Sequence, residues 1–171
     1  MDSPTFNKEK FETVILYIIK KCGGLSNFGK TTLFKMLYFS DFNHYERYET
    51  YLTGEAYVKL KRGPAPRHFN EVIKSMEEEG KVSLCKVPFH TYLQQKFITQ
   101  TEPNLDLLTG RELETIDNVI DELQTMNASR ISEHSHEDLP YKATEDNKVI
   151  DYELVFYREP MFSVREYDEE Q

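Results

Sequence analysis

Apolar residues recur at helical spacing in the segment 6–21 (FNKEKFETVILYIIKK), and this pattern limits how the fold can begin. Five of them share one face of a helix with 3.6 residues per turn. These are Phe11, Val14, Ile15, Ile18 and Ile19. Two lysines in the last turn and the glycine pair at 23–24 are typical of a helix end. A strand over VILYII is the alternative, but the pattern begins before that run and therefore favours a helix.

The choice between helix and strand decides how to interpret the next segment, GLSNFGKT at 24–31. It fits G-x-x-x-x-G-K-[ST], a loop whose backbone N–H groups surround phosphates. In that interpretation Gly24 and Gly29 bend the loop, Lys30 binds phosphate and Thr31 holds Mg²⁺. Such a loop follows a buried strand and needs an acidic metal ligand elsewhere. The predicted helix, and the lack of an apolar strand ending in an acid, make a nucleotide-binding enzyme the less favoured interpretation.

The rest of the chain predicts more helices, joined by short β-rich segments. Apolar groups nearly encircle the middle turns of the segment 30–48, which predicts a helix at the centre of the core. The other helices are expected at 67–79, 109–124 (with a Thr109–Glu112 capping box) and 128–137. The β-rich pieces are expected at 50–60 and, as a hairpin, at 82–89 and 91–99. Residues 148–157 leave a strand and a short helix as alternatives.

This order of elements predicts an α+β fold, a mainly α-helical single domain with a small antiparallel β-sheet or hairpin. Strands and helices do not alternate, which argues against a doubly wound parallel sheet. A chain of 171 residues is long enough for one core. We expect one domain over 1–171, with its core at about 6–157 and an acidic, solvated tail at about 165–171.

Acidic residues outnumber basic ones by 30 to 21, which gives a net charge of -9. This balance disfavours nucleic acid as a partner, because phosphate backbones require a Lys/Arg surface. The best local basic patch consists of Lys59, Lys61, Arg62 and Arg67. No apolar run approaches the length of a membrane span, and the two distant cysteines are typical of a reducing cytosol. We therefore expect a cytoplasmic protein without a membrane partner.

Several polar residues in the first half of the chain are candidate site residues. Tyr38 and Asp41 are three apart and share a helix face. They form either a polar cluster that shapes a partner site or a core tyrosine satisfied by an acid. Gly63 and Pro64, with Pro66, predict a rigid turn, since proline fixes φ and removes a donor. The flanking Arg62 and Arg67 either meet an acidic partner or form a solvated face.

The densest group of possible metal ligands consists of His134, His136, Glu137 and Asp138. Imidazoles and carboxylates suit Zn²⁺, but the spacing is not that of a structural zinc site and no cysteine is near. A histidine that caps or bridges helices is the favoured interpretation, with general acid–base chemistry as an alternative. Nearby serines lack a G-x-S-x-G elbow. We therefore expect no metal, no cofactor and no catalytic residues.

The helix at 67–79 and the hairpin that follows it resemble half of a winged helix. This makes a DNA-binding transcriptional regulator the alternative to a protein-binding role. The acidic run at 77–79 argues against it, because a recognition helix needs Lys or Arg near phosphates.

Three stretches together resemble the Panacea antitoxin family, also called SocA-like: GKTTLFKMLYFSDF at 29–42, YLTGEAYVKLKRGPAPRHFNEVIKSMEEEGKV at 51–82 and ISEHSHEDLPY at 131–141. The first carries the family pattern K-x-L-Y-x-x-D at Lys35, Leu37, Tyr38 and Asp41. The second has Gly63-Pro64 and then a helix ending before Gly80. The third has Ser135 and His136, followed by Tyr141 where many relatives carry Trp.

The resemblance implies an antitoxin that neutralises a cognate toxin protein by direct binding and is not an enzyme. Members occur in bacterial genomes, prophages and phages, and one branch delivers its toxin to a protease as an adaptor. In relatives the segment matching 29–31 opens the tyrosine-bearing helix, so the GxxxxGKT match is interpreted as accidental. Because partners differ so widely in this family, the resemblance transfers neither the toxin, nor its contact residues, nor an oligomeric state.

Overall fold

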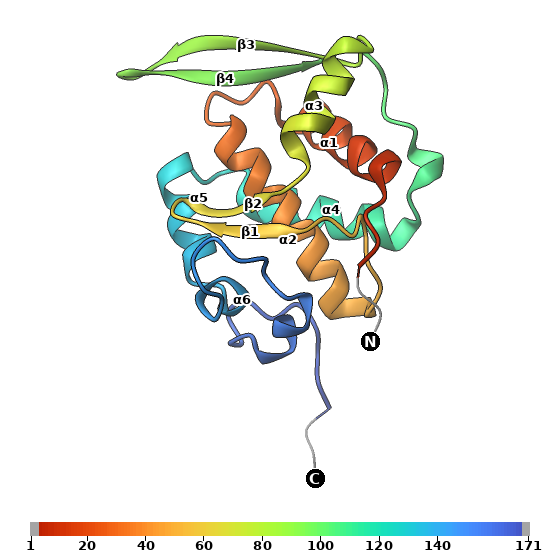
Figure 1. Ribbon diagram of the computed structural model, residues 1–171, viewed down its shortest axis with the longest axis vertical. Coiled ribbons are helices and arrows are strands. Elements are labelled where there is room, and N and C mark those ends of the chain that lie inside the picture. The colour runs from red at the N-terminus through yellow and green to blue at the C-terminus, as the bar shows by residue number, and fades with distance from the viewer. Residues whose placement is uncertain (1–3, 169–171) are drawn as a thin grey trace.

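The computed structural model describes residues 4–168. The α-helices are α1 (Lys8–Cys22), α2 (Lys30–Tyr48), α3 (Phe69–Glu78), α4 (Gly110–Leu123), α5 (Ala128–His136) and α6 (Leu139–Lys142). Two 3-10 helices are η1 (Leu105–Leu107) and η2 (Tyr152–Tyr157). The strands are β1 (Tyr57–Leu60), β2 (Gly63–Pro66), β3 (Val82–Phe89) and β4 (Tyr92–Thr99). They pair antiparallel as β1–β2 and β3–β4, which confirms a mainly helical α+β fold (Figure 1).

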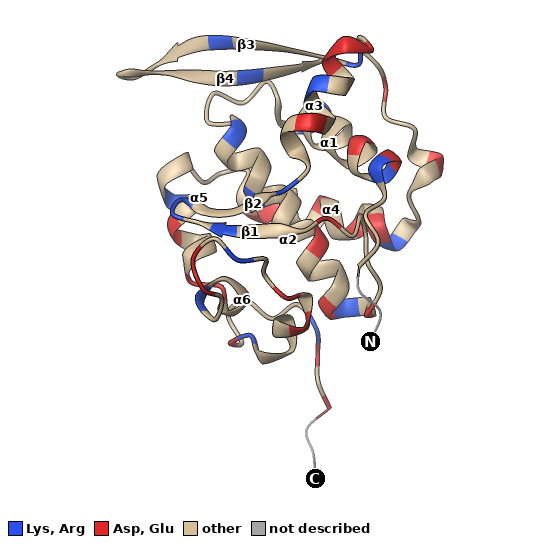
Figure 2. Ribbon diagram, viewed as in Figure 1, with Lys and Arg blue, Asp and Glu red and all other residues tan. Residues whose placement is uncertain are grey.

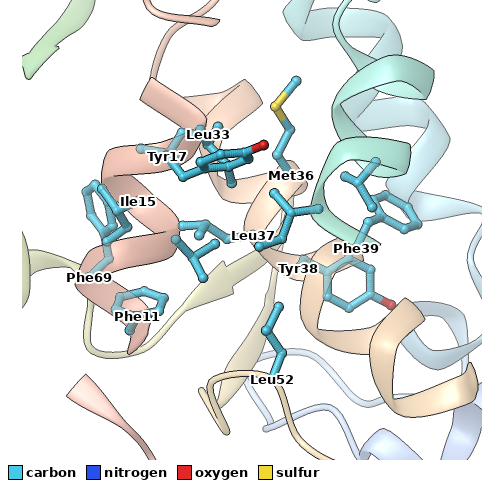
Figure 3. Packing of buried hydrophobic residues seen from close by; sticks show 14 of the residues in the cluster. Phe11, Ile15, Tyr17, Leu33, Met36, Leu37, Tyr38, Phe39, Leu52 and Phe69 are labelled. Carbon is cyan, nitrogen blue, oxygen red and sulfur yellow. The ribbon is translucent and has the colours of Figure 1, made fainter. Parts of the chain in front are cut away.

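The two N-terminal helices form the centre of the core. The helix predicted at 6–21 is confirmed as α1, which begins after the N-cap Asn7 and ends before Gly23. Its middle turns are buried on every side, and the strand alternative for this segment is wrong. The helix α2 runs through the middle of the molecule and contacts α1, α4, α5, β2 and η2 (Figure 1). Its residues Leu33, Met36 and Leu37 lie among side chains of α1 and α3 (Figure 3).

The segment GPAP at 63–66 is a strand, not the turn that its prolines predict. Gly63 pairs with Leu60 and Pro64 with Lys59, so the turn itself lies at residues 61–62. The strand tolerates proline because β2 pairs only with β1, so its other edge has no strand partner and a missing N–H there is harmless. The β-like segment expected at 50–60 is a strand only from Tyr57.

The hairpin expected after the third helix is confirmed. It consists of β3 and β4 and extends beyond the helical body at the top of Figure 1. Val82 and Phe97 at its base are buried, whereas Tyr92 and Leu93 near its tip are 50% and 63% exposed. The hairpin therefore lies beside the start of α2 and borders the surface there.

The C-terminal third combines both structures that its sequence left open. Val149 makes an isolated bridge to Val58 beside β1, and η2 follows directly. The capping box at Thr109 and Glu112 is present at the start of α4. Beyond η2, Phe162 is buried, and Tyr167 donates a hydrogen bond to Glu46 (2.9 Å). Of the tail predicted at 165–171, residues 169–171 lie outside the described residues.

Within residues 4–168, no helix is long and apolar enough to cross a membrane.

Candidate functional site

Three adjoining hollows, with volumes of about 600, 350 and 250 Å³, form one cleft that we call the α2 cleft. All three are lined by Thr31 and Arg62. Their walls come from the start of α2, the β1–β2 turn, α5 and the β3–β4 hairpin. Segments far apart in the sequence therefore meet here, on the side of the molecule where α5 and the β1–β2 turn lie next to each other (Figure 1).

The floor of the cleft is the N-terminus of α2. Its N-cap is Gly29, which has no side chain to accept a hydrogen bond from the first helical N–H groups. A Cβ at Gly29 would lie 2.9 Å from Cγ of Gln94, so the side chain of Gln94 occupies the space that a capping residue would need. Gln94 is only 7% exposed, and its Oε1 has no hydrogen-bond partner among the described residues.

Lys35 extends from α2 beneath the β1–β2 hairpin and lines the cleft. It is 2% exposed, and its Nζ donates to the carbonyl oxygen of Pro64 at 3.3 Å. Burial lowers the pKa of Lys35 to about 8. Gly63 has φ +118°, and a Cβ there would come within 2.6 Å of Cε of Lys35 and Oγ of Ser135. The glycine in the Gly63-Pro64 pair therefore leaves room for the lysine side chain.

The two arginines that flank β2 in the sequence are separated in the structure. Arg62 lies in the exposed β1–β2 turn, and its carbonyl oxygen accepts a hydrogen bond from Oγ of Ser132 on α5 (2.5 Å). This bond fixes the turn against α5 and holds the arginine at the cleft. Arg67 follows the other end of β2, is exposed and does not line the cleft.

His134 and His136 face different surroundings. His136 lines the cleft and stacks on Tyr141 with ring centroids 5.0 Å apart. His134 packs against Phe39 of α2 and Phe162, which matches a histidine that bridges separate segments. Among residues 4–168, no three His, Cys, Asp or Glu side chains are placed to hold a metal ion. Asp138, one of the possible ligands in that group, accepts hydrogen bonds from Arg158.

Tyr38 belongs to a buried polar network below the cleft. Its hydroxyl donates to Asp138 (2.8 Å), and Arg158 donates to both oxygens of Asp138 (2.9 and 2.8 Å). Arg158 also donates to Asn43 (2.8 Å) and Glu46 (3.1 Å). We call these residues the Arg158 network. All are buried in this chain, and their hydrogen bonds join α2, the start of α6 and the C-terminal segment.

Asp41 lies in a second buried group. It accepts hydrogen bonds from the backbone N–H of Thr53 (2.8 Å) and the hydroxyl of Tyr57 (2.6 Å). Burial raises the pKa of Asp41 to about 6, although these hydrogen bonds oppose the shift. Tyr38 and Asp41 are thus close in sequence but belong to different hydrogen-bonded groups, since the acid beside Tyr38 is Asp138.

The sequence pattern did not single out Thr31, Tyr92 and Gln94 as partners in one site, and it placed Arg158 outside the expected core. An aromatic residue next to the expected hairpin turn is the local signal that could have drawn attention to Tyr92. The ion pairs of Arg158 join residues up to 112 apart in the sequence, and no periodicity reports such contacts.

The surroundings of GLSNFGKT differ from those of a phosphate-binding loop. The element before it is the helix α1, not a strand. Lys30 is the first residue of α2, and its Nζ lies 5.3 Å from the centroid of the Phe34 ring. The strand–loop–helix geometry that the nucleotide interpretation requires is therefore replaced by helix–loop–helix.

The α3 helix and the β3–β4 hairpin do have the order of a winged helix. The α3 face formed by Phe69, Val72 and Met76 is buried, and the exposed positions include Glu71, Glu77 and Glu78. Figure 2 shows several acidic positions on the α3 ribbon. An acidic helix surface repels a phosphate backbone, which disfavours the DNA-binding alternative.

A protein-family model described as Antitoxin SocA-like, Panacea domain, matches residues 33–141. The chain belongs to this family. Neither the curated proteins nor the solved structures contain a match. The Panacea match extends from the first turns of α2 to Tyr141 in α6, so it includes the β1–β2 turn, the hairpin and α5, which wall the cleft. The family is one of antitoxins, which implies a toxin as partner and a role outside catalysis.

Proposed function

We propose that this Panacea-family protein is an antitoxin that neutralises a cognate toxin protein by direct binding, without catalysing a reaction. The family match over residues 33–141 is the observation that carries the proposal. The mechanism is stoichiometric: a surface of the antitoxin covers the active site of the toxin or holds the toxin inactive.

The α2 cleft supports this mechanism by its shape and its residues. It combines an exposed arginine, Arg62, with the exposed Tyr92 and Leu93 of the hairpin. Arginine and tyrosine are frequent anchors of protein interfaces. Specific interfaces bury about 800 Å² per partner, whereas this chain exposes 9768 Å². The chain therefore has ample surface for such a complex, in which we expect Arg62, Tyr92 and Leu93 to contact the toxin.

The test is co-expression with the product of the adjacent gene. That product alone is expected to stop growth, and co-expression with this chain to restore growth and yield a complex that co-purifies. A toxic neighbour that this chain neither rescues nor binds would contradict the proposal for that pair. A charge-preserving surface variant such as Lys74→Arg on α3 is the matched control and is expected to rescue fully.

A second form of neutralisation is delivery of the toxin to a protease, the adaptor role found in one branch of the family. The two forms differ in toxin level. Under pure occlusion, toxin accumulates in the complex and rescue is unchanged in hosts that lack individual ATP-dependent proteases. Under delivery, toxin half-life falls when this chain is present, and rescue is lost in the host that lacks the relevant protease.

A further inference from the structure

Lys35 is a buried cation without a matching anion. Its Nζ has a single oxygen acceptor among residues 4–168, the carbonyl of Pro64 at 3.3 Å, and its nearest aromatic contact is the Phe34 ring at 6.0 Å. A lysine ammonium has three N–H donors, and a charge removed from water is normally paired. By contrast, the buried Arg158 meets both Asp138 and Glu46. The charge on Lys35 therefore lacks the compensation that the fold gives to Arg158.

The surroundings of Lys35 are cationic although the whole chain is acidic. The hollow of about 350 Å³ that it lines is also lined by Lys30, Lys61 and Arg62. Among the described residues, no Asp or Glu lines this hollow or the adjoining one of about 250 Å³, and Glu133 lines the third hollow of the cleft. Figure 2 shows basic positions at the start of α2 and at the β1–β2 turn. In a chain of net charge -9, this local excess of cations favours an anionic partner.

The start of α2 adds donors to the same place. The first N–H groups of the helix, from Lys30 to Thr32, have no acceptor within the helix, and the N-cap Gly29 supplies none. The positive end of the helix dipole favours an anion there. Lys30 and Thr31 line both basic hollows, so these donors lie close to Lys35.

Gln94 indicates what kind of molecule carries the anion. Its Oε1 is buried at the cleft and has no donor within the described part of the chain. Ionised carboxylates and phosphodiesters have no hydrogen to donate to that oxygen, but a peptide N–H can donate to it. The exposed Tyr92 and Leu93 beside it offer contacts to apolar side chains. A polypeptide with acidic side chains supplies both carboxylates for the cations and N–H groups for the orphaned acceptor. Nucleic-acid bases also carry N–H donors, but the continuous phosphate charge of a nucleic acid is disfavoured by a chain of net charge -9.

We propose that the α2 cleft binds an acidic segment of the partner protein, with one carboxylate of that segment paired to Lys35. The inference rests on the proposed function, since the toxin supplies the segment. Lys30, Arg62 and the first N–H groups of α2 bind the remaining negative charge, and a backbone N–H of the segment donates to Gln94. The neutralised toxin is accordingly expected to present Asp or Glu side chains at this contact.

The first test uses this chain alone and so does not depend on the toxin. The protein is labelled with ¹³C at lysine Cε, and the Lys35 signal is identified by its absence from the Lys35→Met spectrum. The probes are a hexaglutamate peptide, a hexaglutamine peptide, inorganic phosphate and a single-stranded oligothymidylate. We expect a saturable shift of the Lys35 signal with hexaglutamate and none with hexaglutamine. Stronger binding of phosphate or oligothymidylate than of hexaglutamate, or no saturable shift with any probe, would overturn the proposal.

The second test measures capture of the toxin by variants. Lys35→Met keeps the aliphatic stem and removes the charge, and we expect at least tenfold weaker capture. Lys30→Met at the half-buried rim is the second variant, with an expected three- to tenfold loss, in case the first does not fold. Lys74→Met on the exposed face of α3 is the matched control. Full capture by both cleft variants would refute the inference while leaving the antitoxin role intact. If hexaglutamate shifts Lys35 but the wild type rescues no toxin, the proposed function fails and the site stands.

Discussion

Buried charged side chains are paired near one end of α2 and unpaired near the other. Near its C-terminal end, Glu46 and Asn43 meet Arg158, which also holds Asp138, so every charged group of the Arg158 network has a partner. Near its N-terminal end, Lys35 is equally buried but has only a carbonyl oxygen at 3.3 Å. One helix therefore carries both a satisfied polar network and an unsatisfied cation.

This difference suggests that the paired charges have a structural role and that the unpaired cation has a role in binding. A buried ion pair fixes the positions of the segments that supply its partners, even where it adds little net stability. An unpaired buried cation does nothing for the fold and opposes it through desolvation. Its presence beside a cleft is explained if another molecule supplies the counter-charge, because natural proteins tolerate destabilising groups where function needs them. Removing the cation of the Arg158 network should therefore destabilise the fold, whereas removing the unpaired cation of Lys35 should stabilise it. Smaller changes at Tyr38 and Arg62 should have smaller effects on stability.

Arg158→Met is expected to have the largest effect. It leaves Asp138 and Glu46 buried without their cation, which costs about 3–5 kcal/mol of unfolding free energy. Urea unfolding followed by circular dichroism measures this loss. Arg67→Met is the matched control, because Arg67 is exposed and lies outside the network, and such surface substitutions usually change stability by less than about 0.5 kcal/mol. Equal losses in the two variants would show that the Arg158 network is not a structural centre.

Lys35→Met is expected to act in the opposite direction and stabilise the free protein at pH 7 by roughly 2–3 kcal/mol. Because burial lowers the pKa of Lys35 to about 8, the unfolded chain binds more protons than the folded chain above that pH. Wild-type stability therefore gains a contribution between about pH 8 and the ordinary lysine pKa near 10.4. The variant lacks this contribution, so the difference between the two proteins shrinks as pH rises. A constant difference from pH 7 to 10 would show that Lys35 is not desolvated.

Sequence patterns predicted the helices of this fold but not the contacts of its buried charges. Helical periodicity located α1 and α2, because apolar spacing directly reflects which side of a helix is buried. The strand at Gly63–Pro66 was missed because proline normally interrupts sheets, and only the tertiary pairing with β1 shows that both prolines lie in an edge strand. The ion pairs of Arg158 and the isolation of Lys35 are properties of the tertiary structure. Lys35 was singled out only as a position in a family pattern, with no indication that it is buried or unpaired.

Tyr38→Phe is expected to weaken the paired end without breaking it. The variant loses one hydrogen bond to Asp138, but Arg158 still donates to both oxygens of that carboxylate. The expected loss is about 1–1.5 kcal/mol, the usual contribution of one such bond. Thermal and urea unfolding measure it, with Tyr92→Phe at the exposed hairpin tip as the matched control. A loss as large as that of Arg158→Met would mean that the tyrosine, and not the arginine, holds the network together.

Arg62→Gln is expected to have the smallest effect on stability and a clear effect on toxin binding. The side chain is exposed, and the hydrogen bond that fixes the turn uses the backbone carbonyl, which the substitution leaves in place. Stability should change by less than about 0.5 kcal/mol. Capture of the toxin should weaken about five- to tenfold at low salt and less at high salt, because exposed charges are screened. Arg67→Gln removes the same charge from the other end of β2, outside the cleft, and should leave capture unchanged. If the two substitutions weaken capture equally, overall charge accounts for the effect, and the cleft at the start of α2 does not select the acidic partner.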